Sequence, residues 1–124
     1  MKKHLVSVLI FTSMLLVLPT YSTAAELAED LLEKSLISHL RGHILLVVGG
    51  DWFQGKEKIL EIRQDEKDLD SVIVKVQVVT FQGPHSPPYM QEIITFNIQG
   101  HKIIPIDYFN KVIPESDWST FNIP

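Results

Sequence analysis

The sequence contains no cysteine and only 6 glycines in 124 residues, and its longest run of basic residues is the pair Lys2-Lys3. Without cysteine the chain has no disulfide framework, no thiol nucleophile and no thiolate metal ligand. It also lacks the Gly-x-Ser-x-Gly motif of serine hydrolases and the glycine patterns that bind nucleotide phosphates. These absences leave no catalytic residue, metal or cofactor to assign, so we expect a non-enzymatic protein.

Residues 1–24 have the composition of an export signal. Two lysines follow Met1, and an apolar run extends from Leu5 to Leu18. Small residues then occupy the positions that signal peptidase reads, and the expected cleavage lies between Ala24 and Ala25. The sequence therefore predicts a secreted, extracytoplasmic protein whose mature chain begins at Ala25.

A retained N-terminal anchor is the alternative to cleavage. The apolar run is shorter than the roughly 20 residues that a membrane-spanning helix needs, so we expect no stable membrane span once the signal is removed. A lipid anchor is excluded more firmly, because bacterial lipoprotein processing requires a cysteine at the new N-terminus and the chain has none.

The charge balance limits the partners of the mature chain. When Lys2 and Lys3 leave with the signal and no acid does, Lys+Arg falls from 11 to 9 against 15 Asp+Glu, a net charge of −6. Nucleic acid is therefore not an expected partner, because no basic stripe is present to neutralise phosphates. Electrostatic adsorption to an anionic surface is disfavoured for the same reason, so the partner is an unknown protein or envelope ligand recognised by specific contacts.

The first part of the mature chain has a helical composition. Residues 24–41 are rich in Ala, Leu, Glu and Lys, and their leucines recur at helical spacing. We expect Gly42 to interrupt this helix. The apolar run 44–48 fits either a further helical turn or a short strand, and we favour the helix; Gly49-Gly50 then ends it.

The second part of the mature chain has the pattern of strands. The clearest is 72–81, where valines alternate with Lys75 and Gln77. Together these patterns predict an α+β fold in which one or two N-terminal helices pack on one face of a three- to four-stranded antiparallel meander. The predicted strands are 58–63, 72–81, 92–98 and 102–109. We expect one domain over 25–109 and a tail over 110–124, whose Val112, Ile113, Trp118 and Phe121 pack back onto it.

The order of the strands follows from their composition. Seven of the ten residues in 72–81 are β-branched, which would be an aggregation hazard at an exposed edge. We therefore place this strand centrally, between 58–63 and 92–98. Pro105 lacks a backbone donor, so 102–109 is expected at the sheet edge.

Two aromatic-bearing segments are candidate binding sites. Residues 83–88 contain three prolines and Gly83, and we interpret them as a rigid turn that displays His85 and Tyr89. Trp52 and Phe53 lie at a glycine-flanked corner and could serve as binding anchors. In each case the alternative is structural: a hairpin connector, or aromatics that cap the core.

The histidines support a second functional hypothesis, a small exported metal-dependent hydrolase. His39 and His43 have the i, i+4 spacing of a metal pair, and a third ligand would come from His85 or His101. No glutamate next to His39 completes a metalloprotease motif. Surface or half-buried histidines are the simpler interpretation.

The segments 78–89 and 92–96 resemble a family of short exported proteins of unknown function from Gram-positive, spore-forming bacteria. Its members have a signal peptide, a helical front and an aromatic-Gly-x-His-x-Pro turn between two strands. The resemblance covers roughly residues 30–109 and is specific mainly at 80–96. The chain departs from the family at 49–52, where relatives tend to have a tyrosine-rich helix end, and in its longer tail. The resemblance implies export and the fold; it implies no activity, cofactor, partner or catalytic residue.

Overall fold

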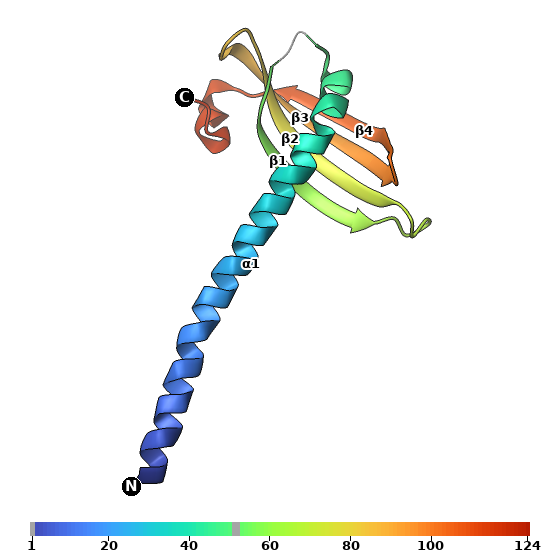
Figure 1. The fold of residues 1–124 in the computed structure, drawn as a ribbon. Helices are drawn as coiled ribbons and strands as arrows, with labels where there is room; N and C mark the ends of the chain where they lie inside the picture. Colours follow the sequence, from blue (N-terminus) through green and yellow to red (C-terminus); the bar gives the residue numbers. More distant parts are fainter. Residues whose placement is uncertain (1, 51–52) are drawn as a thin grey trace. The chain divides into compact units, whose positions relative to one another are not determined.

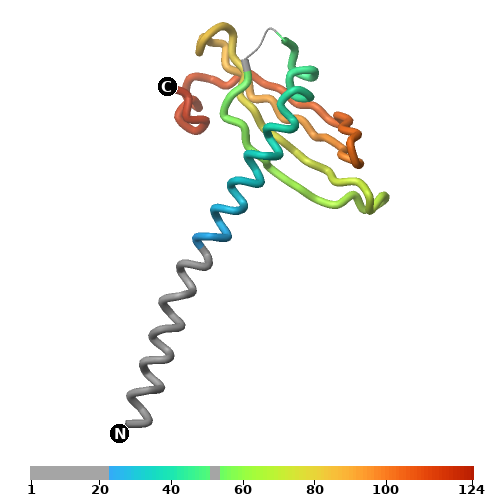
Figure 2. Tube along the Cα trace, viewed as in Figure 1, coloured from blue at the N-terminus to red at the C-terminus, as the bar shows by residue number. Residues whose placement is uncertain are grey.

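The computed structural model describes the backbone of residues 2–50 and 53–124. Side chains are described for residues 23–50 and 54–124, the coloured part of the trace in Figure 2. The chain divides into two compact units at Ser35–Leu36. The first unit is helical, and its Lys34 and Asp30 form an ion pair of 2.9 Å one turn apart. The second unit holds the end of the helix, the sheet and the tail, and it contains all the sites discussed below.

A single helix, α1 (Lys2–Val48), precedes the sheet. The predicted helix over residues 24–41 is confirmed, whereas the predicted interruption at Gly42 is wrong. Gly42 is exposed and has no side chain to place, so it costs only about 1 kcal/mol relative to alanine. Buried Leu40 and Ile44 lie on either side of it, and their packing outweighs that cost. Within the part of the chain that the structure describes, no helix is both long and apolar enough to cross a membrane.

Helix α1 ends at a glycine, as the sequence predicts. Gly49 has a φ of 96°, a left-handed conformation that favours glycine, and its N–H donates to the carbonyl of Leu45 at 2.9 Å. The run 44–48 is helical, which confirms the favoured interpretation of that segment.

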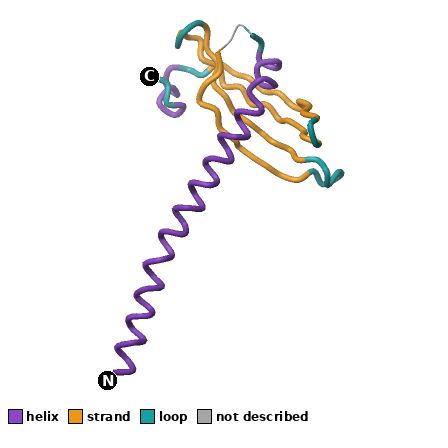
Figure 3. The backbone as a smooth tube through the Cα atoms, viewed as in Figure 1, coloured by secondary structure: helices purple, strands orange, loops and turns teal. Residues whose placement is uncertain are grey.

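Four antiparallel strands form one sheet in sequence order, which confirms the predicted meander (Figures 1 and 3). The strands are β1 (Phe53–Gln64), β2 (Val72–Gln82), β3 (Ser86–Gln99) and β4 (Lys102–Val112). The β-branched strand β2 is central, with β1 and β3 on its two sides, and β4 is an edge strand. Each strand is longer than the range predicted for it from the sequence.

Strand β3 begins earlier than the prolines suggested. The predicted turn over 83–88 is too long, because β3 starts at Ser86 and includes Pro87 and Pro88. The ladder between β2 and β3 shifts register between Thr80 and Gln82, so neither proline has a partner on β2. Pairing with β4 starts only at Met90. The prolines therefore cost no ladder hydrogen bond.

The end of helix α1 packs on one face of the sheet, which we call the helix face. Leu40 and Ile44 form a buried cluster with side chains from β2 and β3. The members from the sheet are Val74, Val76, Val78, Ile94 and Phe96. Arg41 also reaches Glu57 on β1 with an N–O distance of 3.2 Å.

The other face of the sheet is covered by residues 113–124, and we call it the tail face. After β4 the chain forms a short 3₁₀ helix, η1 (Glu115–Phe121). Ile113 and Ile123 make a second buried cluster with Val79 and Tyr89, against which Trp118 and Phe121 pack. Val112, which we expected in this packing, is instead 58% exposed. Neighbouring Val78 and Val79 point to opposite faces and are both buried, so this end of the sheet is covered on both sides.

Candidate functional site

The turn between β2 and β3 holds His85 in a fixed position. Gly83 and His85 have φ values of 59° and 58°, a left-handed conformation that is uncommon for a residue other than glycine. The His85 ring stacks on Phe81 with centroids 4.9 Å apart and an interplanar angle of 17°. The Tyr89 hydroxyl donates to the His85 carbonyl oxygen at 2.7 Å. These two contacts hold a strained backbone position, as is typical of functional sites.

Beside this turn lies a cavity of about 230 Å³, which we call the hairpin cavity. Its walls are mostly aliphatic and aromatic, and they come from β1, β2, β3 and the tail. The lining residues are Gly55, Lys56, Val79, Phe81, His85, Tyr89, Ile123 and Pro124. An apolar concavity with a few polar groups is the usual form of a small-molecule site, although this one is smaller than the usual range of about 300–1,000 Å³.

The basic side chains of the hairpin cavity are Lys56 and His85, and no described lining side chain is a carboxylate. Lys56 also has a positive φ, 52°, so both basic residues occupy left-handed backbone positions. The chain as a whole is acidic, with a net charge of −4. The cavity therefore offers an apolar surface with a local positive charge.

The tail holds one wall of this cavity. Trp118 packs edge-on against Tyr89 with centroids 5.1 Å apart, and its Nε1 donates to the Ile113 carbonyl at 3.3 Å. Ile123 belongs to the same buried cluster and lines the cavity. The cavity thus exists only when the tail is docked on the sheet.

The structure brings two of the four predicted binding residues together and corrects one of them. His85 is exposed, as expected of a displayed side chain. Tyr89 is only 5% exposed, so the prediction that it is presented on the surface is wrong; it lines the cavity from within the tail-side cluster. Trp52 lies outside the described residues, as does the side chain of Phe53, whose backbone begins β1.

The histidines do not form the metal site of the second hypothesis. His85 and His101 lie in turns at opposite ends of β3, which for a 14-residue strand is a separation of roughly 40 Å. His43 packs edge-on against Phe96 with centroids 6.4 Å apart, and His39 lies one turn earlier on α1. Among the described side chains, no three His, Cys, Asp or Glu residues are placed to hold a metal ion.

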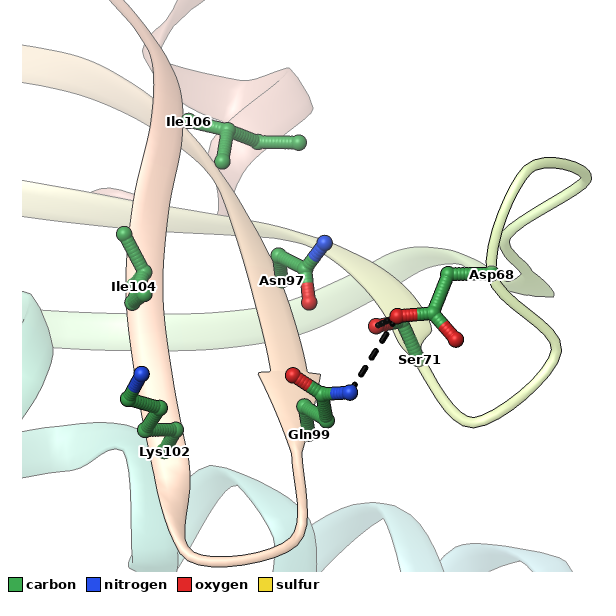
Figure 4. A pocket seen from close by; sticks show the side chains of 7 residues that line it. All are labelled: Asp68, Ser71, Asn97, Gln99, Lys102, Ile104 and Ile106. Atoms are coloured by element: carbon green, nitrogen blue, oxygen red, sulfur yellow. Dashed lines mark hydrogen bonds between the residues drawn. The ribbon is translucent and has the colours of Figure 1, made fainter.

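A second hollow of about 180 Å³ lies at the opposite end of the tail face (Figure 4). Its lining residues are Asp68, Ser71, Asn97, Gln99, Lys102, Ile104 and Ile106. Asp68 Oδ2 accepts hydrogen bonds from Ser71 Oγ at 3.1 Å and from Gln99 Nε2 at 3.2 Å. These bonds tie the loop between β1 and β2 to the end of β3, which gives Asp68, Ser71 and Gln99 a structural role.

A row of polar side chains crosses the helix face from β1 to the edge strand β4. Thr80 Oγ1 donates to Glu92 Oε1 at 2.9 Å, and the Tyr108 hydroxyl donates to Glu92 Oε2 at 2.5 Å. Glu92 is 3% exposed, and Gln54 pairs with Thr80 in the ladder. Gln54 Oε1 is buried and accepts no hydrogen bond from the described residues. We call Gln54, Thr80, Glu92 and Tyr108 the polar row.

The polar row changes the chemistry of Tyr108. Burial of the hydroxyl, the hydrogen bond to Glu92 and the negative charge of that carboxylate together raise the pKa of Tyr108 from 10.0 to about 12. This row was not predicted from the sequence. One signal was present in the sequence. Glu92 has the period-two spacing that places it on the same strand face as the apolar Ile94 and Phe96, which indicates a buried acid.

The fold and the cavity define a small α+β domain with a preformed, basic-rimmed apolar site and no metal cluster among its described residues. The model of the DUF3888 family, proteins of unknown function, matches residues 28–111, and the chain therefore belongs to that family. The match spans the end of helix α1 and the whole sheet up to Lys111. No curated protein and no solved structure matches the chain.

Proposed function

We propose that the protein is an exported, non-enzymatic binding protein of the Gram-positive cell envelope or its surroundings, and that it binds through the hairpin cavity. The observation that carries the proposal is the cavity itself: an apolar, preformed space with Lys56 and His85 as its basic groups. Its occupant is a small molecule, or the end of a larger one, with an apolar body and an anionic group. No described side chain in the lining is a carboxylate, a serine or a thiol, which supports binding over hydrolysis.

A pair of simple amphiphiles tests the charge preference of the cavity. Octanoate and octylammonium have the same chain length and opposite charge. Trp118 packs on Tyr89, which lines the cavity, so tryptophan fluorescence reports occupancy. We expect octanoate to change the emission at lower concentration than octylammonium does. Equal responses to the two would contradict an anion-selective site.

Two variants test the residues directly. Asparagine tolerates a positive φ better than most residues, so Lys56→Asn and His85→Asn remove the side chains with little backbone cost. Because Lys56 is exposed, its loss should weaken octanoate binding by about two- to fivefold, equivalent to roughly 0.5–1 kcal/mol. Lys102→Asn, at the other end of the sheet, is the matched control and should leave binding unchanged.

Export is tested separately, by the mass of the protein recovered from the medium of an expressing Gram-positive host. The proposal requires a chain that begins at Ala25. Ala24→Trp places a large residue at the cleavage position and should leave the signal attached, whereas Glu26→Gln should be processed normally. If the unmodified protein instead remains with the cells as a full-length chain, secretion is refuted.

A further inference from the structure

Strand β4 is an edge strand that exposes apolar side chains on both of its faces. Its large apolar residues are Ile104, Ile106, Tyr108, Phe109 and Val112, each between 43% and 58% exposed. Natural edge strands are usually shielded by charge, proline or a covering segment, because a free edge pairs with other chains. The tail does not cover this edge: it crosses the tail face toward β1, where Ile123 meets Gly55 and Lys56 at the hairpin cavity.

The two edges of the sheet differ in their protection. Strand β1 carries Lys58, Glu61 and Arg63 and has two register shifts, which disrupt any regular ladder on its outer side. Strand β4 has one shift, opposite Thr95 and Phe96, and Pro105 lies next to it. Pro105 therefore shields only the first part of the strand. Residues 107–112 form a regular segment without proline, and its two charged residues, Asp107 and Lys111, have opposite signs.

The backbone of this segment points outward at alternate residues. The Ile113 N–H donates to the Tyr89 carbonyl of β3 at 2.8 Å. Because N–H and C=O groups alternate direction along a strand, those of Val112, Asn110 and Tyr108 point away from β3. The Tyr108 N–H is bonded to the side chain of Asp107 at 3.0 Å. Among the described residues, the outward groups of Asn110 and Val112 have no backbone partner.

We infer that β4 pairs with β4 of a second copy of the chain, antiparallel and centred on Phe109, to make a continuous eight-stranded sheet. In this register Tyr108 of each copy forms the hydrogen-bonded pair with Asn110 of the other, which uses the outward groups of both. Asp107 of each copy then lies opposite Lys111 of the other, so two ion pairs form across the two-fold axis. The two Phe109 side chains meet at the centre.

Charge complementarity selects this register. The outward groups also permit pairings centred on Tyr108 or on Asn110. The first places Asp107 opposite Phe109, and the second places Lys111 opposite Phe109, so neither forms an ion pair. Only the register centred on Phe109 matches the acid with the base, and it leaves Pro105 outside the paired segment. The Asp107 carboxylate exchanges its bond to the Tyr108 N–H for the second copy's Lys111.

A charge-swap series tests the pairing in the full chain, with sedimentation velocity over a range of protein concentrations. The unmodified protein should form a dimer. Asp107→Lys and Lys111→Asp should each place like charges opposite one another and raise the dissociation constant at least tenfold. The double variant restores opposite charges and should dimerise like the unmodified protein. Lys102→Asp, on the same strand outside the paired segment, is the control and should dimerise normally.

Three results would overturn the inference. One is a monomer at every concentration. Another is an association that the single substitutions leave unchanged, which would assign it to another surface, such as the apolar run in residues 5–18. The third is a double variant as weak as the single ones. Circular dichroism establishes that every variant is folded, and amide exchange provides a second readout: the Asn110 N–H should become protected only at concentrations where the dimer forms.

Discussion

The Tyr108 hydroxyl lies 2.5 Å from Glu92 Oε2 and joins strand β4 to the buried carboxylate of β3. Thr80 of β2 donates to the other carboxylate oxygen. One acidic side chain in the core therefore accepts hydrogen bonds from the two neighbouring strands. Since buried polar groups are costly unless they are bonded, this arrangement ties the positions of three strands to one residue.

Tyr108 should ionise later than an ordinary tyrosine. In an absorbance titration near 295 nm, we expect one tyrosine with a midpoint of about 12 instead of 10.0. The Tyr108→Phe variant should lack this transition. An unmodified protein whose tyrosines all titrate near 10 while it is still folded would contradict the hydrogen bond to Glu92.

The same shift makes stability depend on pH. The raised pKa means that folded Tyr108 keeps its proton between about pH 10 and pH 12, whereas the unfolded chain has lost it. The contribution of Tyr108 to stability is therefore fully present below pH 10 and decreases as the pH rises through that range. Urea denaturation at pH 9 and pH 11 should show a smaller loss of stability in Tyr108→Phe than in the unmodified protein.

Removing Glu92 should cost more than neutralising it. Glu92→Ala leaves the hydroxyls of Thr80 and Tyr108 without their acceptor and opens a void, and we expect a loss of about 2–4 kcal/mol. Glu92→Gln keeps the volume and one acceptor oxygen, and the hydroxyls can reorient, so its cost should be about 1 kcal/mol. Urea denaturation measures both. Equal costs would show that the hydrogen bonds contribute little to stability.

The two faces of β2 should respond differently to substitution by an acidic residue. Val74 is 1% exposed in the helix-side cluster, so Val74→Asp buries an unpaired charge and should unfold the domain. Lys75 is part-exposed on the other face, and its Nζ lies 3.7 Å from Glu61 Oε2. Lys75→Asp loses that weak ion pair and adds a repulsion, with an expected cost of about 1 kcal/mol or less. A folded Val74→Asp protein, by circular dichroism, would contradict the assigned core.

The tail should contribute measurably to stability. Trp118→Ala removes the edge-on contact with Tyr89 and the hydrogen bond to Ile113. We expect a loss of about 2 kcal/mol, smaller than for a fully buried tryptophan because Trp118 is only half-buried. Ser119→Ala, exposed on the same 3₁₀ helix, is the control. Thermal denaturation of the two variants gives the comparison.

Much of the fold follows from local patterns in the sequence. The alternation in 72–81 marks a strand with two different faces, and its β-branched composition places it in the middle of the sheet. The errors arose where a long-range contact outweighs a local preference. Gly42 remains helical because Leu40 and Ile44 pack on the sheet, and Pro87 enters a strand because a register shift removes its partner.

The candidate site was predicted less completely than the fold. A proline-rich turn with Gly83 indicated a constrained His85, and the structure shows that constraint. The burial of Tyr89 depends on Trp118 and Ile123, which approach from the end of the chain and leave no local signal. Lys56 has a positive φ that no sequence pattern announced, so its place beside His85 was not predictable.

The position of Ile123 couples the docking of the tail to the occupancy of the hairpin cavity. Its side chain is at once part of the buried cluster that holds the tail and part of the wall of the hairpin cavity. Linkage is reciprocal: a change that stabilises tail docking raises the affinity of the cavity for its occupant, and binding of the occupant stabilises tail docking by the same coupling free energy. A protein with an occupied cavity would therefore resist carboxypeptidase digestion of residues 118–124 better than one with an empty cavity. The rate of tail digestion would then report how much of the protein has an occupant.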